Sequence, residues 1–190
     1  MYRRLVVAAA LLSLFCLMGS PALCHSGPSA EHPSVAVGFH NTEAPLGVRW
    51  WLGSQKAGFD LGFGFHSDDA TSSGFPNDKL TGWAVDGGIP IVLKSWPRVH
   101  VLFRPGVLYA SQQVEDPSTP LVFDTENQKD FFITGELEGE GFILENFSVS
   151  ASTGFAYESF DPGFGASKET FFTTLGHNFT EVGFHLYFLR

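Results

Sequence analysis

The chain has 190 residues, of which 44% are hydrophobic and 16% are charged. This length suggests one domain, and the hydrophobic content excludes a disordered chain. The chain carries 11 Lys and Arg residues against 20 Asp and Glu residues, which excludes the basic surface of a nucleic-acid-binding protein. Its charged fraction lies below the value of about 25% that is usual in soluble domains. Phe supplies 20 residues and Gly 21, and this combination favours a β surface that faces lipid.

A targeting segment opens the chain. Arg3 and Arg4 form a positive start, residues 5–18 are apolar, and small residues suitable for cleavage follow in 19–24. The apolar run is shorter than the ~20 residues that a transmembrane helix needs. We therefore predict that residues 1–24 are a cleaved signal peptide and that any insertion into a membrane is by β-strands.

The two cysteines add little to the exported chain. Cys16 lies inside the predicted signal peptide. Leu23 precedes Cys24, at a place where lipoprotein processing prefers a small residue, so we do not expect lipidation. At most one cysteine remains after cleavage, which excludes an internal disulfide and a cysteine-based metal site. Residues 25–34 are rich in Ser, Pro and His and are predicted to be a linker.

Eight segments after the linker have the pattern of amphipathic β-strands. In the third segment, Phe59, Phe63 and Phe65 alternate with glycine and polar residues. Side chains of a strand point alternately to its two faces, so one face of this segment is apolar and the other is small and polar. Most of the segments reach the length of about 9–11 residues that a tilted membrane strand needs. The eight segments are residues 35–40, 46–53, 57–66, 81–93, 99–112, 131–144, 147–160 and 171–189.

The connections between these segments differ in length in a regular way. Short connections tend to alternate with long polar ones, as in an antiparallel up-and-down barrel with two unlike ends. Eight strands would place both ends of the barrel chain at the end with short turns. The short connections are 54–56, 95–98 and 145–146, the long ones are 67–79 and 115–130, 161–170 is intermediate, and 41–45 is short where the pattern expects a long one.

The chain resembles the small outer-membrane β-barrel proteins of Gram-negative bacteria, the OmpA-like/OmpX-like barrel superfamily. The resemblance rests on the signal peptide, the eight amphipathic segments, the first hairpins in 47–52 and 60–65, and an aromatic final strand. It implies an all-β, eight-stranded antiparallel transmembrane barrel in residues 35–190, located in the outer membrane. The implied partners are membrane lipid and the assembly machinery, which would bind the C-terminal strand. Such chains usually end on an aromatic residue, whereas here two residues follow Phe188.

The two faces of the strands predict an interior and an exterior. Charged side chains on a lipid face are costly, so we expect the ionisable set to point inward. The predicted polar network of the interior is Arg49, Asp60, Asp86, Arg104, Glu136, Glu138, Glu140 and Glu158, accompanied by His40, His100, Glu181 and His185. The predicted lipid-facing and girdle residues are Trp50, Phe59, Phe63, Phe65, Trp83, Phe103, Phe184 and Phe188.

These expectations favour a non-enzymatic integral membrane protein with a structural or surface-interaction role. An eight-stranded barrel is filled by its own side chains, so the inward charges are expected to pair with one another. The alternative use of the same residues is a narrow polar or proton path. We expect no cofactor and no metal. The loops 67–79 and 115–130 are the candidate contacts for an extracellular partner, and the acidic loop 115–130 is also the candidate contact for a cation.

Two other functions stay open from the sequence. A secreted, lipocalin-like carrier of hydrophobic ligands would turn the apolar face inward and the glutamates outward. A lipid A-modifying barrel enzyme is the less favoured alternative, since His177 has Thr180 as its nearest hydroxyl and lacks a serine two residues after it. The side of the wall that carries the apolar residues discriminates the carrier from the membrane barrel.

Overall fold

A computed structural model describes residues 34–39, 41, 43–53, 55–70, 78–115, 125–173 and 180–189. The predicted signal peptide and all but the last residue of the predicted linker lie outside this part of the chain. The described residues form strands and turns, with no helix among them, and hence none that is long and apolar enough to cross a membrane. The strands are β1 (Val35–Phe39), β2 (Leu46–Trp51), β3 (Gly58–Ala70), β4 (Asp78–Gly88), β5 (Ile91–Trp96), β6 (Val99–Glu115), β7 (Thr125–Leu144), β8 (Phe147–Asp161), β9 (Glu169–Thr173) and β10 (Thr180–Leu189).

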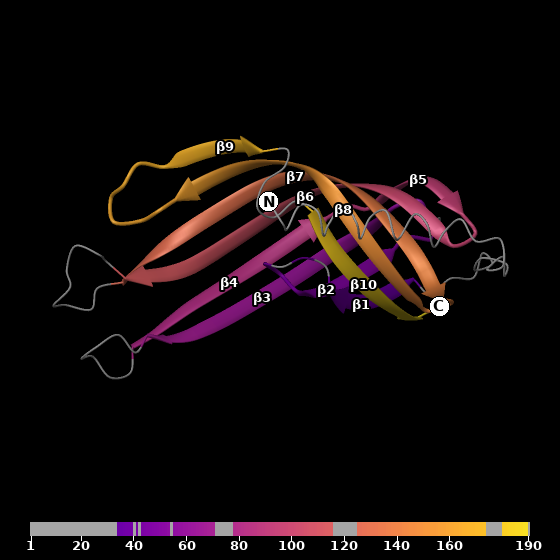
Figure 1. Cartoon of the computed structure of the whole chain (residues 1–190), viewed down its shortest axis with the longest axis horizontal. Helices are drawn as coiled ribbons and strands as arrows, with labels where there is room; N and C mark the ends of the chain where they lie inside the picture. The colour runs from indigo at the N-terminus through magenta and orange to yellow at the C-terminus, as the bar shows by residue number, and fades with distance from the viewer. Residues whose placement is uncertain are drawn as a thin grey trace, which may run out of the picture.

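The ten strands occupy eight positions around a closed antiparallel wall (Figure 1). β4 and β5 both pair with β6, one after the other, and together fill one position. β9 and β10 both pair with β8 in the same way. β1 pairs with β2 on one side and with β10 on the other, and this last pairing closes the barrel. The predicted eight-stranded antiparallel barrel is therefore confirmed.

The barrel has two unlike ends. Val35 at the start of β1 pairs with Leu189 at the end of β10, so both ends of the barrel chain lie together. The two-residue turns between β5 and β6 and between β7 and β8 lie at this same end, which we call the short-turn end. The β3–β4 and β6–β7 hairpins project from the opposite end, which we call the long-hairpin end (left in Figure 1).

The predicted boundaries need correction at two kinds of place. β3, β4, β6 and β7 continue into the segments 67–79 and 115–130, so that residues 67–70, 78–79, 115 and 125–130 are strand, and residues 71–77 and 116–124 lie outside the described residues. These extensions are polar, and their backbone pairing continues without an apolar face. The predicted fourth strand is interrupted at Pro90, which has no N–H to donate to a neighbour. The predicted eighth strand is divided into β9 and β10.

The apolar face of the barrel wall points outward, as the alternation of residues predicts. In β2 the odd and even positions differ sharply: Arg49 and Trp51 are buried, whereas Trp50 is 57% exposed. Two small apolar clusters lie inside the barrel. One, toward the short-turn end, consists of Ala36, Trp51, Leu102 and Tyr187; the other, toward the long-hairpin end, consists of Leu108, Phe132 and Ala156. Seven of the predicted ionisable residues occupy the interior between these clusters: Arg49, Asp60, Asp86, Arg104, Glu136, Glu138 and Glu140.

Candidate functional site

Arg49 of β2 binds two carboxylates through two forked contacts. Its Nε and Nη2 donate to Oδ1 and Oδ2 of Asp60, each at 2.8 Å. Its Nη1 and Nη2 donate to Oε1 and Oε2 of Glu138 at 2.9 and 2.8 Å. The first partner lies opposite Arg49 in the β2–β3 register, and the second is on β7, across the interior. A guanidinium is planar and presents pairs of N–H donors along its edges. Two carboxylates that lie against two different edges can therefore each accept two hydrogen bonds from it.

Arg104 of β6 continues the network toward the long-hairpin end. Its Nε donates to Asp60 Oδ2 at 3.0 Å, its Nη1 donates to Glu136 Oε1 at 3.0 Å, and its Nη2 donates to Asp86 Oδ2. Asp60 is therefore shared by both arginines. Gly88 leaves the room that the guanidinium needs, because a Cβ at this position would lie 2.4 Å from Cζ of Arg104.

Glu140 accepts hydrogen bonds from polar groups on the side of the network that faces the short-turn end. Ser148 and Tyr187 donate to its Oε1 at 2.6 and 2.7 Å, and Trp51 Nε1 donates to the Tyr187 oxygen at 3.3 Å. Its Oε2 lies 3.5 Å from Nη1 of Arg49. The cluster thus reaches from β2 to β10 through hydrogen bonds and ion pairs.

Two guanidinium groups meet five carboxylates in this cluster, which we call the interior charge network. All seven side chains belong to residues that are at most 8% exposed. Hydroxyl groups of Thr134, Ser148 and Tyr187 donate further hydrogen bonds to these carboxylates. The members are Arg49, Asp60, Asp86, Arg104, Glu136, Glu138 and Glu140.

The eighth predicted interior residue, Glu158, lies apart from this network. It is half-buried on β8, opposite Phe132 in the register, and therefore nearer the long-hairpin end. His185 is buried with its Nδ1 3.7 Å from Glu140 Oε1, and His100 Nδ1 lies 4.0 Å from Glu140 Oε2. His40 lies outside the described residues.

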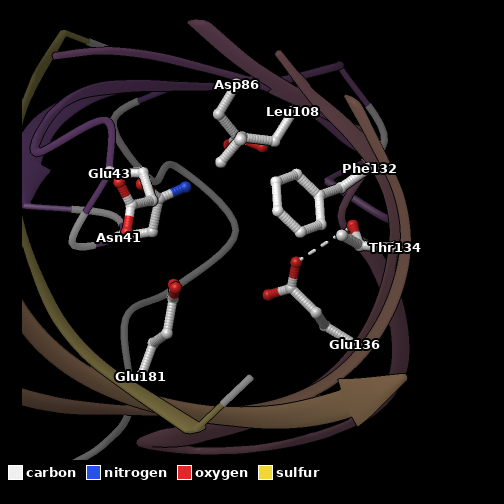
Figure 2. A pocket seen from close by; sticks show the side chains of 8 residues that line it. All are labelled: Asn41, Glu43, Asp86, Leu108, Phe132, Thr134, Glu136 and Glu181. Atoms are coloured by element: carbon white, nitrogen blue, oxygen red, sulfur yellow. Dashed lines mark hydrogen bonds between the residues drawn. The ribbon is translucent and has the colours of Figure 1, made fainter. Parts of the chain in front are cut away.

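A cavity of about 20 Å³ opens between the network and the long-hairpin end (Figure 2). This volume suits about one water molecule. Glu136 points into it and accepts a hydrogen bond from Thr134 at 3.2 Å, and Glu181 reaches in from β10 on the opposite side. The remaining lining residues are Asn41, Glu43, Asp86, Leu108 and Phe132. A cavity of this size has no room for a hydrophobic cargo.

The predicted lipid-facing residues all lie on the outer face. Seven of them are between 43% and 65% exposed, and Phe103 is half-buried among its outward neighbours. The seven are Trp50, Phe59, Phe63, Phe65, Trp83, Phe184 and Phe188.

The candidate set predicted from the sequence did not include the two donors to Glu140, Ser148 and Tyr187, nor Trp51, which donates to Tyr187. Trp51 and Tyr187 share the inward face with Arg49 and His185, two positions along the same strands. Alternation alone could have placed them inside. For Trp51, the aromatic character obscured this, because aromatic residues in such strands are expected to face lipid.

The described part of the chain holds no cluster of side chains suited to a metal ion. No group of three or more His, Cys, Asp or Glu side chains there is placed to hold a metal ion. His177 lies outside the described residues, and so does the side chain of Thr180. Comparison of the chain with protein-family models, with curated proteins and with solved structures found no match.

Proposed function

We propose that this chain is an integral β-barrel protein of a Gram-negative outer membrane, exported by its signal peptide. The observation that carries the proposal is the inverted distribution of side chains. Among the residues that the structure describes, twenty-nine large apolar ones are exposed on the outside, whereas the two arginines and five carboxylates of the interior charge network are buried. A protein folded in water shows the opposite distribution, because apolar side chains are favoured inside and charged side chains are favoured at the surface.

The outer surface also has the banded order that a bilayer favours. Aromatic residues lie near the long-hairpin edge of the apolar belt, where the rings of Trp83 and Tyr109 are 5.3 Å apart and Tyr109 pairs with Phe131. Beyond this line the outward side chains become polar: Thr81 and Gln113 hydrogen-bond at 2.9 Å. Aromatic girdles followed by polar extensions are typical of outer-membrane barrels.

The role we propose is non-enzymatic. The interior is filled by the charge network between two apolar clusters, which argues for a wall that is structurally closed and does not conduct. Function would then belong to the outer wall or to the projecting β3–β4 and β6–β7 hairpins, as a structural element or as a contact surface for an extracellular partner. Loops that a rigid scaffold positions commonly carry binding.

The competing carrier function requires an apolar interior with room for cargo. Leu108 and Phe132 do line the cavity, but its volume is about 20 Å³ and four carboxylates share it. The apolar surface of this barrel lies outside. The inverted wall therefore supports the membrane barrel over the soluble carrier.

Cell fractionation with gel electrophoresis tests the proposal. The membrane fraction of expressing cells is run unheated and boiled, and a folded membrane barrel should show a mobility difference that boiling abolishes. Purified chain should also acquire this difference when it is diluted from urea into phosphatidylcholine vesicles. Recovery in the soluble periplasm, without any shift, would contradict membrane insertion.

Catalysis is tested separately from location. Lipid A is extracted from cells with and without the protein, and its acyl chains are compared by mass spectrometry. An unchanged pattern is expected. Loss of an acyl chain that depends on the protein would contradict the non-enzymatic role and leave the barrel in place.

A further inference from the structure

The basic side chains are unevenly placed on this acidic barrel. The structure describes seven Lys and Arg side chains, and two of them are in the interior charge network. Two others, Lys129 and Lys168, lie at the long-hairpin end. The remaining three lie at the short-turn end around β5, and we call them the basic rim: Lys56, Lys94 and Arg98.

A β-bulge places Lys94 on the outer face. β5 pairs with β6 through Val92 opposite Leu102 and then Lys94 opposite Val101, so Leu93 is an extra residue. Val92 packs on the apolar cluster inside the barrel, and without the bulge Lys94 would share that inward side. Bulges redirect side chains in this way. The Lys94 ammonium lies over the ring of Trp96, 5.8 Å from its centroid.

The neighbouring segments bring the other two cations beside β5. Lys56 accepts a backbone hydrogen bond from Val92 N at 2.9 Å, which ties the β2–β3 connection to β5. Arg98 lies in the β5–β6 turn, and its carbonyl accepts from Phe142 N of β7 at 2.8 Å. Both side chains are at least partly exposed.

Among the described residues, no carboxylate pairs with the basic rim. None of the three cations forms an ion pair with any described carboxylate, although the exposed Lys168 at the other end pairs with Asp161 at 3.2 Å. The one acid in the adjoining β7–β8 turn is Glu145. Three cations against one acid give this edge a positive charge on a chain whose formal net charge is −9.

We propose that the basic rim is a binding site for the phosphate headgroup of an anionic phospholipid in the leaflet at the short-turn end. Lysine stems can lie along apolar surface and carry their charge to the headgroup level. The outward residues of β5 supply that surface, since Ile91 is 38% and Leu93 58% exposed. Basic residues at the membrane surface attract anionic lipid. This inference rests on the proposed membrane insertion.

Native mass spectrometry measures the preference directly. The folded protein in detergent is mixed with equal amounts of phosphatidylglycerol and phosphatidylcholine that carry the same acyl chains, and retained lipids are counted. The wild type is expected to retain phosphatidylglycerol at least about fivefold over phosphatidylcholine, with a smaller ratio at higher salt. The test variant is Lys94→Gln/Arg98→Gln, and the matched control, which removes two charges from the other end, is Lys129→Gln/Lys168→Gln.

The outcomes separate the lipid site from the membrane barrel. All variants are first refolded into pure phosphatidylcholine vesicles and checked by the unheated gel shift. Failure of the wild type at that step contradicts both the proposed function and the site. Folding followed by equal retention of the two lipids overturns the site alone, and so does an equal loss of preference in the test and control variants. The site is supported if only the test variant loses the preference for phosphatidylglycerol and the Lys94→Arg variant keeps it.

Discussion

Removal of the Arg49 guanidinium gives the sharpest test of the interior charge network. In Arg49→Met the side chain keeps much of its length but loses four hydrogen bonds of 2.8–2.9 Å to Asp60 and Glu138. Asp60 retains Arg104, whereas Glu138 loses the cation that pairs with it. The substitution leaves a buried carboxylate without compensation, which is the costly way to break an ion pair.

The expected loss in the free energy of unfolding is about 3–5 kcal/mol, the cost of removing one partner from a buried pair. With a urea dependence of about 2 kcal/mol per molar, the unfolding midpoint should fall by roughly 2 M. Arg49→Lys keeps the charge but supplies no planar fork, so an intermediate loss is expected. The double variant Arg49→Met/Glu138→Gln should be less destabilised than the sum of its two single variants.

Urea unfolding in phosphatidylcholine vesicles, followed by tryptophan fluorescence and by the unheated gel shift, measures these differences. Lys168→Met is the matched control, because it breaks an ion pair that lies on the surface, and its midpoint should stay unchanged. Equal unfolding midpoints for Arg49→Met and Lys168→Met would contradict a stabilising role of the buried ion pairs. Additive effects of the Arg49 and Glu138 substitutions would show that the two side chains do not interact.

Three other predictions concern the wall, the packing around the network and a surface loop. Phe63→Arg places a charge in the outer belt, and near the bilayer midplane it should cost about 2–4 kcal/mol in vesicles, whereas a water-facing site would tolerate it. Gly88→Ala brings a Cβ to 2.4 Å from Arg104 Cζ, so the guanidinium must move and the unfolding free energy should drop by about 1–3 kcal/mol. Asp161 lies beyond the aromatic line, and its pKa is lowered by hydrogen bonds from Lys168 and from a backbone N–H. The ionised Asp161 therefore stabilises the folded loop at pH values above its pKa in the unfolded chain, and this stabilisation is lost as the pH falls through the lowered pKa of the folded state. NMR titration of the Asp161 carboxyl group measures that pKa, and Lys168→Met should raise it.

Controls accompany each of these predictions. Phe63→Leu keeps an apolar outer face and should refold as the wild type does. Gly139→Ala adds a methyl group whose nearest neighbour would be 4.0 Å away, so it should be neutral. An equal effect of the two glycine substitutions would contradict the packing argument. If Lys168→Met leaves the pKa of Asp161 unchanged, that result would contradict the assigned ion pair.

The closed barrel and its two faces could be predicted because strand alternation is a local property of sequence. Asp60 lies between Phe59 and Leu61, and this neighbourhood alone assigns the carboxylate to the side opposite the apolar residues. The same reasoning applied to Glu136, Glu138 and Glu140. The burial of these residues follows once the apolar face is outside.

The pairing within the interior could not be predicted in this way. Which carboxylate meets Arg49 depends on the register between strands and on the curvature of the wall, and Glu138 is 89 residues away in sequence. The division of the predicted fourth strand depends on Pro90, which has no backbone N–H. The sequence shows the proline, but it does not show that the pairing with β6 is interrupted there. The long hairpins were missed since polar strands lack the apolar alternation by which strands were recognised.

The sharing of Asp60 between Arg49 and Arg104 has a consequence for how the barrel reaches its final state. Arg49 is on an early strand, and two of its carboxylate partners arrive only with β7. A bilayer strongly opposes a charged group whose polar partners are incomplete, so the first hairpins gain little by entering it ahead of the rest. Contacts between residues distant in sequence also slow assembly. Given the proposed membrane insertion, we therefore expect insertion and closure to occur as one concerted step, in which the interior arginines and carboxylates pair while the wall crosses the membrane.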